Sequence, residues 1–304
     1  MTSTQATTVL GDVEVTRIQE YVGPGAATPG FLFPDSDAAL WSGNADWLDP
    51  DFYDAGRGTL RSVLHSWLIR SEGMIVLVDT GAGNGKERPH APAYAHHDNP
   101  YLANLEAAGV RAEDVDIVVN THLHVDHVGW NTRLDGREWV PTFPRAQYLM
   151  TAEDVEFWDP MRYPRPPGDG NLNVFEDSVA PVDRAGLVRR WSGTHRINGE
   201  LTLEAAPGHT PGSSVLRLRS RNAGALFVGD ILHSPVQIMA PDVNSCFCED
   251  PVLARASRRR LLAEAADSNL LVFPGHFGGH SACRVSGTES GAFVIADWAD
   301  FARI

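Results

Sequence analysis

The sequence of 304 residues predicts an α/β protein in which two mixed β-sheets are flanked by helices. Many of the predicted strands follow one another with no helix between them, which disfavours a doubly wound parallel sheet. Hydrophobic residues make up 43% and charged residues 21%, a composition typical of globular proteins and not of fibrous or disordered ones. We find no internal repeat and no low-complexity linker, so a single domain over residues 1–304 is expected.

Residues 1–60 are rich in Gly, Pro and Asp and are predicted to form an irregular N-terminal loop extension. Four aromatic side chains are spread through this stretch: Phe31, Phe33, Trp41 and Trp47. Isolated aromatic side chains in a loop usually pack over another part of the protein. The extension is therefore a candidate lid, and its aromatic side chains could also form the contact of a homodimer.

Strands are predicted from short apolar runs that are bounded by turn residues. The first pair, at residues 65–70 and 74–78, is joined by a turn at 71–73. The remaining predicted strands are 115–120, 147–150, 201–205, 214–218, 225–228 and 270–273.

Three helices are predicted from apolar spacing and from residues that favour helix ends. Residues 98–108 carry apolar side chains at helical spacing, and Gly109 fits the end of that helix. Thr151, with Asp154 three residues later, is typical of a helix N-terminus. The third helix is expected to start at Asp250 or Pro251 and to end near residue 267.

The charge balance and the apolar pattern exclude several classes of partner. The chain has 25 Lys and Arg against 39 Asp and Glu, and its only dense basic run, at 257–260, is expected on a solvated helix face. No apolar run approaches the roughly 20 residues that span a bilayer, and the start lacks a signal-peptide pattern. Its three cysteines are too few for a disulfide framework and are expected to be buried. We therefore expect a cytoplasmic protein without a nucleic-acid or membrane partner.

The stretch Thr121–Gly129 carries the strongest chemical signal in the sequence. It follows a predicted strand directly and places three histidines and one aspartate within six residues: His122, His124, Asp126 and His127. Imidazole and carboxylate together suit Zn, Fe, Co and Ni. In an extended segment His122 and His124 point to one side, and a turn lets the other two point elsewhere, so one loop can serve two metals.

Further candidate ligands follow other predicted strands or lie in tight turns. His209 lies in the turn Pro207–Gly212, Asp230 ends the strand at 225–228, and His276 ends the strand at 270–273. The ends of strands are suitable places for a site because a rigid sheet holds them. Asp79, after the strand at 74–78, is either a turn-forming residue or a group that orients a ligand histidine.

Five of these elements, VDTG, HLHVDH, GH, GD and GH, occur in the order that is typical of the metallo-β-lactamase superfamily. The resemblance covers roughly residues 60–280 and implies an αββα sandwich with a dinuclear metal site at its edge. It implies that His122, His124 and His209 hold the first metal, that Asp126, His127 and His276 hold the second, and that Asp230 bridges both. Asp79 matches the position that supports the metal loop.

Within the superfamily, the sequence resembles the lactonase and methyl-parathion-hydrolase-like branches. The resemblance implies a hydroxide bridging two metals that cleaves a carboxylic ester or a lactone, as in quorum-quenching lactonases or arylesterases. Asp126, Asp230 and His233 are the candidate catalytic residues. His233 stands where acyl-homoserine-lactone lactonases have a tyrosine, so it either relays a proton or lines the pocket. Trp130 and the N-terminal aromatic side chains are expected to form an apolar rim.

Several alternatives stay open at this point. The same site could cleave phosphotriesters, β-lactams or thioesters, or the chain could be a non-hydrolytic metal-binding scaffold. A redox diiron site is disfavoured because His124 stands where those proteins carry a carboxylate. Two divalent metal ions per chain are expected, with Zn²⁺ first and Fe, Mn or Co as alternatives. The expected partner is a small ester or lactone substrate.

Overall fold

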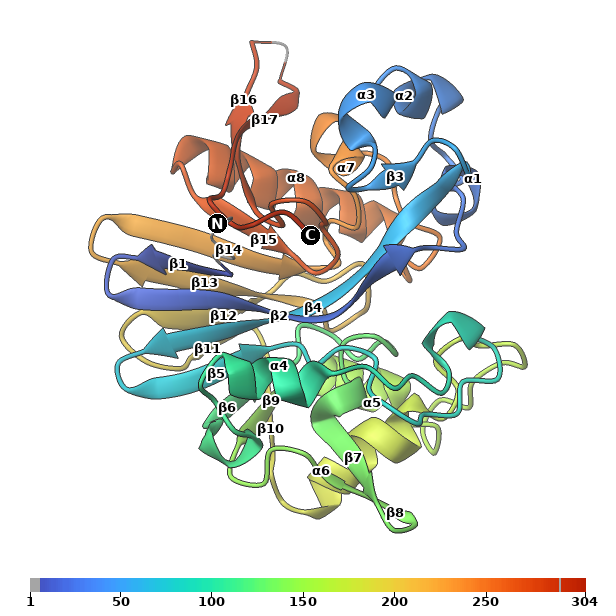
Figure 1. The fold of residues 1–304 in the computed structure, drawn as a ribbon, viewed down its shortest axis with the longest axis vertical. Coiled ribbons are helices and arrows are strands. Elements are labelled where there is room, and N and C mark those ends of the chain that lie inside the picture. Colours follow the sequence, from blue (N-terminus) through green and yellow to red (C-terminus); the bar gives the residue numbers. More distant parts are fainter. Residues whose placement is uncertain (1–5, 290) are drawn as a thin grey trace.

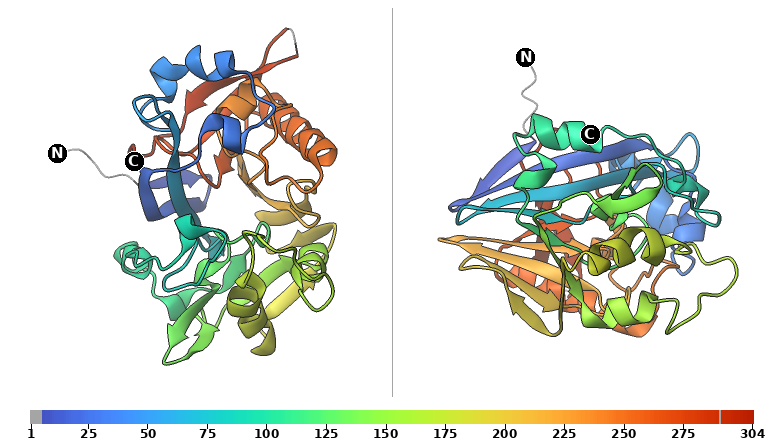
Figure 2. Two further views of the ribbon diagram at one scale, coloured as in Figure 1. Left: turned by 90° about the vertical axis from the view of Figure 1, so that its right-hand side faces the viewer. Right: turned by 90° about the horizontal axis from the view of Figure 1, so that it is seen from below.

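The computed structural model describes residues 6–289 and 291–304. Two β-sheets lie face to face, with helices on their outer sides, so that the chain forms an αββα sandwich (Figures 1 and 2). The predicted architecture of two mixed sheets flanked by helices is therefore confirmed.

The first sheet has eight strands in the order β1-β2-β4-β5-β6-β9-β10, with β3 paired to β4. β5, β6, β9 and β10 run parallel to one another, so their carboxyl ends share one edge of the sheet. The strands are β1 (Thr7–Leu10), β2 (Val13–Pro24), β3 (Tyr53–Asp54), β4 (Thr59–Ser71), β5 (Met74–Val78), β6 (Ile117–Val119), β9 (Gln147–Thr151) and β10 (Val188–Trp191).

The second sheet has seven strands in sequence order, β11 to β17. Its single parallel pair is β14 with β15, so their carboxyl ends also share one edge. The strands are β11 (Thr194–Arg196), β12 (Leu201–Ala205), β13 (Ser214–Ser220), β14 (Ala223–Gly229), β15 (Leu271–Pro274), β16 (Cys283–Gly287) and β17 (Phe293–Trp298). A separate hairpin consists of β7 (Thr132–Asp135) and β8 (Glu138–Pro141).

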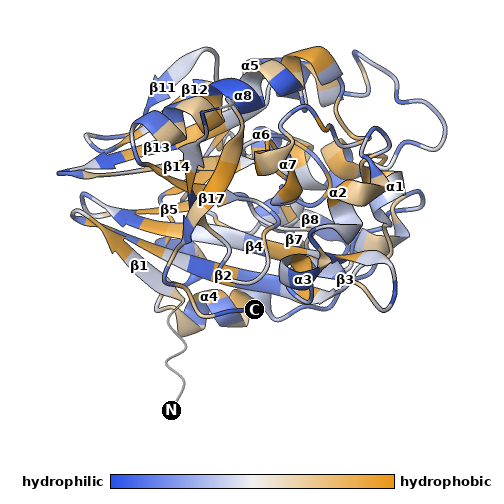
Figure 3. Cartoon of the chain, turned by 90° about the horizontal axis from the view of Figure 1, so that it is seen from above, coloured by the Kyte–Doolittle hydropathy of each residue, from blue (hydrophilic) through white to orange (hydrophobic). Residues whose placement is uncertain are grey.

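The main core lies between the two sheets and contains Trp67 from β4 together with Phe227 and Phe273 from β14 and β15. Two further apolar clusters fill the spaces between each sheet and its outer helices. Figure 3 shows hydrophobic residues on the strands inside the sandwich, whereas α8 carries hydrophilic residues as well. The α-helices are α1 (Pro29–Leu32), α2 (Ala38–Ser42), α3 (Ala45–Leu48), α4 (Tyr101–Ala107), α5 (Ala152–Trp158), α6 (Ala180–Arg184), α7 (Val236–Met239) and α8 (Pro251–Asp267). Short 3-10 or π segments are η1 (Pro92–Tyr94), η2 (Ala112–Asp114), η3 (Gly129–Asn131) and η4 (Phe175–Val179).

The prediction that residues 1–60 are irregular was wrong for residues 7–24, which form β1 and β2 of the first sheet. β2 pairs with β4 along nearly its whole length. Its pattern is hard to recognise because polar side chains such as Arg17 and Glu20 are buried along with Val13 and Val15. Residues 25–58 hold only short helices and β3, so the lid proposal now concerns this shorter segment.

Two smaller predictions also need correction. Arg258 is buried on α8 and not solvated, because its guanidinium donates to the carbonyl oxygens of Ile231, Pro241 and Val243. Cys283 is buried as predicted, but Cys246 is exposed. Among the described helices, none is long and apolar enough to cross a membrane.

Candidate metal centre

The histidine-rich loop lies at the carboxyl end of β6 and is held there by Asp79, which follows the neighbouring strand β5. Asp79 Oδ1 accepts a hydrogen bond from Thr121 N at 2.7 Å, and Oδ2 accepts one from Thr121 Oγ1 at 2.8 Å. Asp79 Oδ2 also lies 2.8 Å from His127 Nδ1. Of the two roles left open for Asp79, the contacts favour orientation of a histidine.

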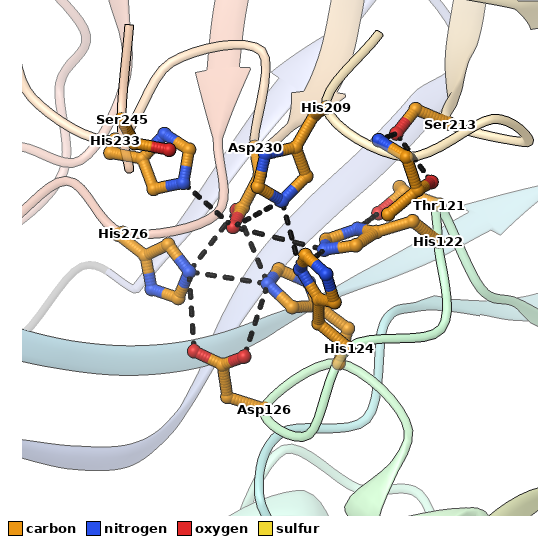
Figure 4. Close-up of polar contacts among 12 residues, drawn as sticks. Thr121, His122, His124, Asp126, His209, Ser213, Asp230, His233, Ser245 and His276 are labelled. Carbon is orange, nitrogen blue, oxygen red and sulfur yellow. Dashed lines mark hydrogen bonds and ion pairs between the residues drawn. The ribbon is translucent and has the colours of Figure 1, made fainter. Parts of the chain in front are cut away.

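The structure brings all seven predicted ligand residues together in two adjacent groups (Figure 4). Within each group, one potential ligand atom of every residue lies within 4.8 Å of the others. The first group is His122, His124, His209 and Asp230, and the second is Asp126, His127 and His276. The first sheet supplies residues 122–127, and loops of the second sheet supply the other three.

Asp230 lies between the two groups and turns one oxygen toward each. Its Oδ2 is 3.4 Å from His209 Nε2 and 3.8 Å from His122 Nε2. Its Oδ1 is 3.2 Å from His127 Nε2 and 3.1 Å from His276 Nε2. This arrangement suits a carboxylate that bridges two cations.

Ring nitrogens of the histidines converge to within hydrogen-bond distance of one another in both groups. His124 Nδ1 is 3.1 Å from His122 Nε2 and 2.9 Å from His209 Nε2, and His127 Nε2 is 3.2 Å from His276 Nε2. Where the facing nitrogens carry no hydrogen, a cation between them would bind lone pairs that the rings cannot satisfy for one another. Imidazole with carboxylate is a donor set typical of zinc sites.

The outward nitrogens have partners that fix the rings. His276 Nδ1 donates to Val63 O at 2.9 Å, which leaves its Nε2 free to face Asp230. His209 Nδ1 faces the Cys248 sulfur at 3.8 Å. Outer contacts of this kind set which nitrogen of a histidine is available as a ligand.

Burial determines the charge state of the histidines in the first group. It lowers the pKa of His122 and His209 well below the usual value, and it lowers the pKa of His124 to about 4. These rings are therefore neutral at pH 7, which is the form in which imidazole binds a metal.

In the second group the nearby Asp230 carboxylate outweighs burial, so the histidine pKa values are raised there and not lowered. Burial alone would lower the pKa of His276, but the charge of Asp230 raises it to about 9. The pKa of His127 is likewise raised well above its usual value, since Asp230 and Asp79 outweigh burial. A cation that binds this group must therefore displace protons.

Asp154 is a residue of the site that the sequence did not reveal. Its buried carboxylate accepts hydrogen bonds from Leu123 N at 3.1 Å, Gly212 N at 2.6 Å and Thr210 Oγ1 at 2.9 Å. It therefore ties the His122–His124 segment to the turn that carries His209. The sequence placed Asp154 in a helix N-terminus, and Thr151 does stand at the N-cap of α5, but its hydroxyl donates to Gly212 O and caps nothing.

Glu20 on β2 is a second residue that sequence reasoning missed, because it falls in the stretch expected to be a loop. Its carboxylate accepts from Ala82 N at 2.8 Å, Gly83 N at 3.0 Å and Trp130 Nε1 at 2.8 Å. Burial raises the pKa of Glu20 to about 7. Trp130 is thus held in the interior and does not line a rim, contrary to the expectation.

His233 lies beside the centre, as its position three residues after Asp230 suggested. Its Nε2 is 3.1 Å from Asp230 Oδ2 without the geometry of a hydrogen bond. Both ring nitrogens are buried and have no hydrogen-bond partner among the described residues. His233 N donates to Gln237 Oε1 at 2.7 Å, which fixes the backbone at this point.

Aromatic side chains surround the centre on two sides. Phe33, from the N-terminal segment, packs edge-on against His233 with ring centroids 6.4 Å apart. Trp158, at the end of α5, packs edge-on against His124 at 5.1 Å. One of the four predicted N-terminal aromatic residues therefore reaches the site, whereas Phe31 is exposed and Trp41 is buried in the core beside α8.

Comparisons with known proteins agree with this architecture. The chain is 27% identical over 141 residues to the N-acyl homoserine lactonase AttM of Azorhizobium caulinodans, a match covering 43% of this chain and 46% of the relative. The match thus spans about half the length of that relative.

Solved structures resemble the chain over nearly its whole length, and a hydrolase and a lactonase are two of them. The hydrolase AbOPH of the beta-lactamase superfamily has a TM-score of 0.79 at 22% identity, covering 98% of this chain and 97% of the other. AidC, a dizinc quorum-quenching lactonase, has a TM-score of 0.75 at 19% identity, covering 96% and 97%.

The family model described as the metallo-beta-lactamase superfamily matches residues 62–276, which is more than half of the chain and includes all seven converging side chains. The chain belongs to the metallo-β-lactamase superfamily.

Proposed function

We propose that the protein is a metal-dependent hydrolase that cleaves a carboxylic ester or a lactone. The observation that carries the proposal is Asp230, whose two oxygens each face a separate group of potential ligands. The likeness to AttM and to AidC, both described as lactonases, supports the substrate class.

We propose that the first group of side chains holds one divalent metal, that the second holds another, and that Asp230 contacts both. The neutral state of His122, His124 and His209 supports a metal at the first group. Zn²⁺ is the expected ion, as in the dizinc relative AidC, with Fe, Mn and Co as alternatives. Such a pair of ions lowers the pKa of bound water and polarises a substrate carbonyl.

We assign proton transfer and the exclusion of bulk water to the residues around the centre. The leaving alkoxide needs a proton when its bond to the carbonyl carbon breaks, and we assign the donation to His233 Nε2, which lies beside Asp230 and has no hydrogen-bond partner among the described residues. Asp126, whose Oδ2 lies 3.6 Å from His276 Nε2, would accept the proton that the attacking water loses. Phe33 and Trp158 limit the access of bulk water from two sides.

We also propose that residues 25–58 form part of the substrate pocket. Phe33 contacts His233, and the exposed ring of Phe31 lies edge-on to Phe247 at 6.4 Å. The Phe33 contact supports an apolar wall beside the centre, where the acyl or aryl part of a substrate would lie, and we propose that the exposed pair Phe31 and Phe247 extends it. Phe31→Ala is expected to raise the KM for hydrophobic substrates without changing the metal content.

The central experiment measures hydrolysis of lactones, aryl esters, phosphotriesters and β-lactams, together with metal content on the same sample. Lactones or aryl esters should be the best substrates, and preference for phosphotriesters or β-lactams would overturn the proposed substrate class. Asp230→Asn should lower kcat by orders of magnitude while the circular dichroism spectrum is unchanged. His195→Ala is a matched control, since His195 lies on β11 outside both groups. Full activity in metal-free protein would contradict the proposal.

The role of His233 has its own test. His233→Gln should slow the hydrolysis of alkyl lactones by about 10²-fold or more, because their alkoxide needs a proton. The same variant should slow the hydrolysis of nitrophenyl esters far less, since nitrophenolate leaves without taking up a proton. An equal loss on both substrate types would assign His233 to the pocket wall.

A further inference from the structure

His209 differs from three other ligand histidines in the partner of its outer nitrogen. In His122, His127 and His276 the outer Nδ1 lies within 3.1 Å of an oxygen atom of the protein. The outer Nδ1 of His209 instead lies 3.8 Å from the Cys248 sulfur, and the structure gives it no other partner among the described residues. One ligand histidine therefore has a thiol as its outer contact.

The tautomer of His209 follows from the contacts of its two nitrogens. Its Nε2 faces the centre, 2.9 Å from His124 Nδ1 and 3.4 Å from Asp230 Oδ2 (Figure 4). A neutral imidazole has one N–H and one free lone pair, so an Nε2 that binds a cation requires the hydrogen on Nδ1. That buried Nδ1–H then donates to the Cys248 sulfur, a weak acceptor. Ser245 Oγ lies 3.7 Å from the same sulfur and can accept its S–H.

The segment 244–250 is joined by its backbone to the turn that carries His209. Glu249 N donates to His209 O at 2.9 Å, and Asp250 N donates to Gly208 O at 2.9 Å. The two residues that follow Cys248 are thus paired with the ligand histidine and the residue before it. This pairing sets the distance between the sulfur and the imidazole ring.

The same segment is anchored at points away from the candidate centre. Asn244 Nδ2 donates to Pro251 O at 3.0 Å, and its Oδ1 accepts from Arg258 Nη1 at 3.3 Å. Cys246 N donates to Leu32 O at 2.8 Å. None of these contacts involves the Cys248 side chain, so a substitution that removes the sulfur leaves the backbone of the segment held in place.

We propose that Cys248 is a positioning residue for the first metal, acting by holding His209 in the tautomer and orientation that present Nε2 as a ligand. The inference rests on the proposed two-metal centre but not on the substrate class. Removal of the sulfur lets the imidazole turn or move its hydrogen to Nε2, and both changes compete with the metal. The second group does not contain His209, so its affinity for metal should not depend on Cys248.

The test is a titration of metal-free protein with Zn²⁺ under reducing conditions, monitored by calorimetry and with the bound metal counted. In Cys248→Ala the affinity of the first site should fall about 10-fold or more, and the affinity of the second site should not change. His122→Ala identifies the binding step that belongs to the first site. Cys246→Ala is the matched control, because this cysteine is exposed and lies in the same segment.

Two further measurements separate a hydrogen bond from packing and from direct ligation. Cys248→Ser keeps an acceptor and should retain more affinity at the first site than Cys248→Ala does. In the wild type loaded with Co²⁺, a sulfur that contacts only His209 gives no thiolate-to-cobalt charge-transfer band in the near ultraviolet. Circular dichroism of each variant checks that the fold is kept.

Each outcome decides the proposal. Selective weakening of the first site in Cys248→Ala, with partial rescue in Cys248→Ser and wild-type binding in Cys246→Ala, supports it. Unchanged affinity in Cys248→Ala overturns it, as does equal weakening of both sites, an equal loss in Cys248→Ser, or a thiolate-to-cobalt band. A wild type that binds two zinc ions but cleaves no ester or lactone would refute the proposed substrate class and leave the role of Cys248 standing.

Discussion

At the scale of single residues, the carboxylate of Asp154 shows how the ligand histidines are held in place. It accepts three hydrogen bonds from two loops, and those loops carry His122, His124 and His209. All three of its partners are donors, so a carboxylate satisfies each of them. The geometry of the candidate centre therefore depends on a residue that does not itself face a metal.

Asp154→Asn should destabilise the protein and loosen the first group of ligands. The amide NH₂ would face at least one of the three donors, leaving a buried N–H or O–H without an acceptor, at a cost of about 1–3 kcal/mol. Urea unfolding of the metal-free proteins measures this cost, and zinc titration measures the loss of affinity. Asp183→Asn is the control, since Asp183 pairs with Arg190 at the surface. Equal stability of Asp154→Asn and the wild type would contradict the prediction.

At the scale of elements, the loop formed by residues 84–99, which lies between β5 and α4, carries a buried lysine, Lys86, whose charge opposes folding. Burial lowers the pKa of Lys86 to about 7, although Asp177 opposes the shift. In the unfolded chain the Lys86 side chain has its ordinary pKa of about 10.4 and stays protonated below that pH. Between pH 7 and 10 the unfolded state therefore binds more protons than the folded state, so this residue makes stability rise with pH.

Lys86→Met should remove that rise. Between pH 7 and pH 10 the free energy of unfolding of the metal-free wild type should rise by on the order of a few kcal/mol relative to that of the variant. Only the wild type has a buried ammonium that loses its proton over this range. Urea unfolding at pH 7, 8.5 and 10 gives the comparison. The Lys86 ammonium also lies 3.6 Å from the ring centre of Trp139, so Lys86→Met removes this cation–π contact together with the charge and its hydrogen bonds, and keeps a side chain of similar length. Parallel stability curves for the two proteins would refute the assignment.

The elements also show which parts of the fold can be predicted from sequence. Strands such as β5 and β15 appear as short apolar runs because both of their faces are buried. β2 does not, since Arg17 and Glu20 are buried among its apolar residues and are satisfied by partners far along the chain. Apolar patterns cannot reveal a buried polar residue whose partners are distant.

The same reasoning separates the predictable from the unpredictable part of the site. The seven converging residues were predictable because histidines and aspartates at strand ends form a recognisable pattern. Glu20 and Asp154 were not, since each is a single ordinary residue whose role comes from hydrogen-bond donors tens of residues away. Sequence patterns indicate the ligands, whereas the residues that orient them emerge only in three dimensions.

At the scale of the whole molecule, the candidate centre lies where the carboxyl ends of strands from both sheets meet. Residues 122–127 follow β6 of the first sheet, while Asp230 and His276 follow β14 and β15 of the second. Bound metal would therefore link the two halves of the sandwich in addition to the apolar core between them. Ions that bind only the folded state stabilise it, by about 2.7 kcal/mol when the free ion exceeds its Kd 100-fold.

Zinc should accordingly raise the Tm by several degrees, and a chelator should reverse the rise. Because Asp230 faces both groups, Asp230→Asn should lose more of this stabilisation than His122→Ala, which removes a ligand from one group only. His195→Ala should keep the full shift. Thermal unfolding of each variant with zinc and with chelator measures the difference. If Asp230→Asn kept the full shift, or if the wild type showed none, a metal bound between the sheets would be ruled out as a source of stability.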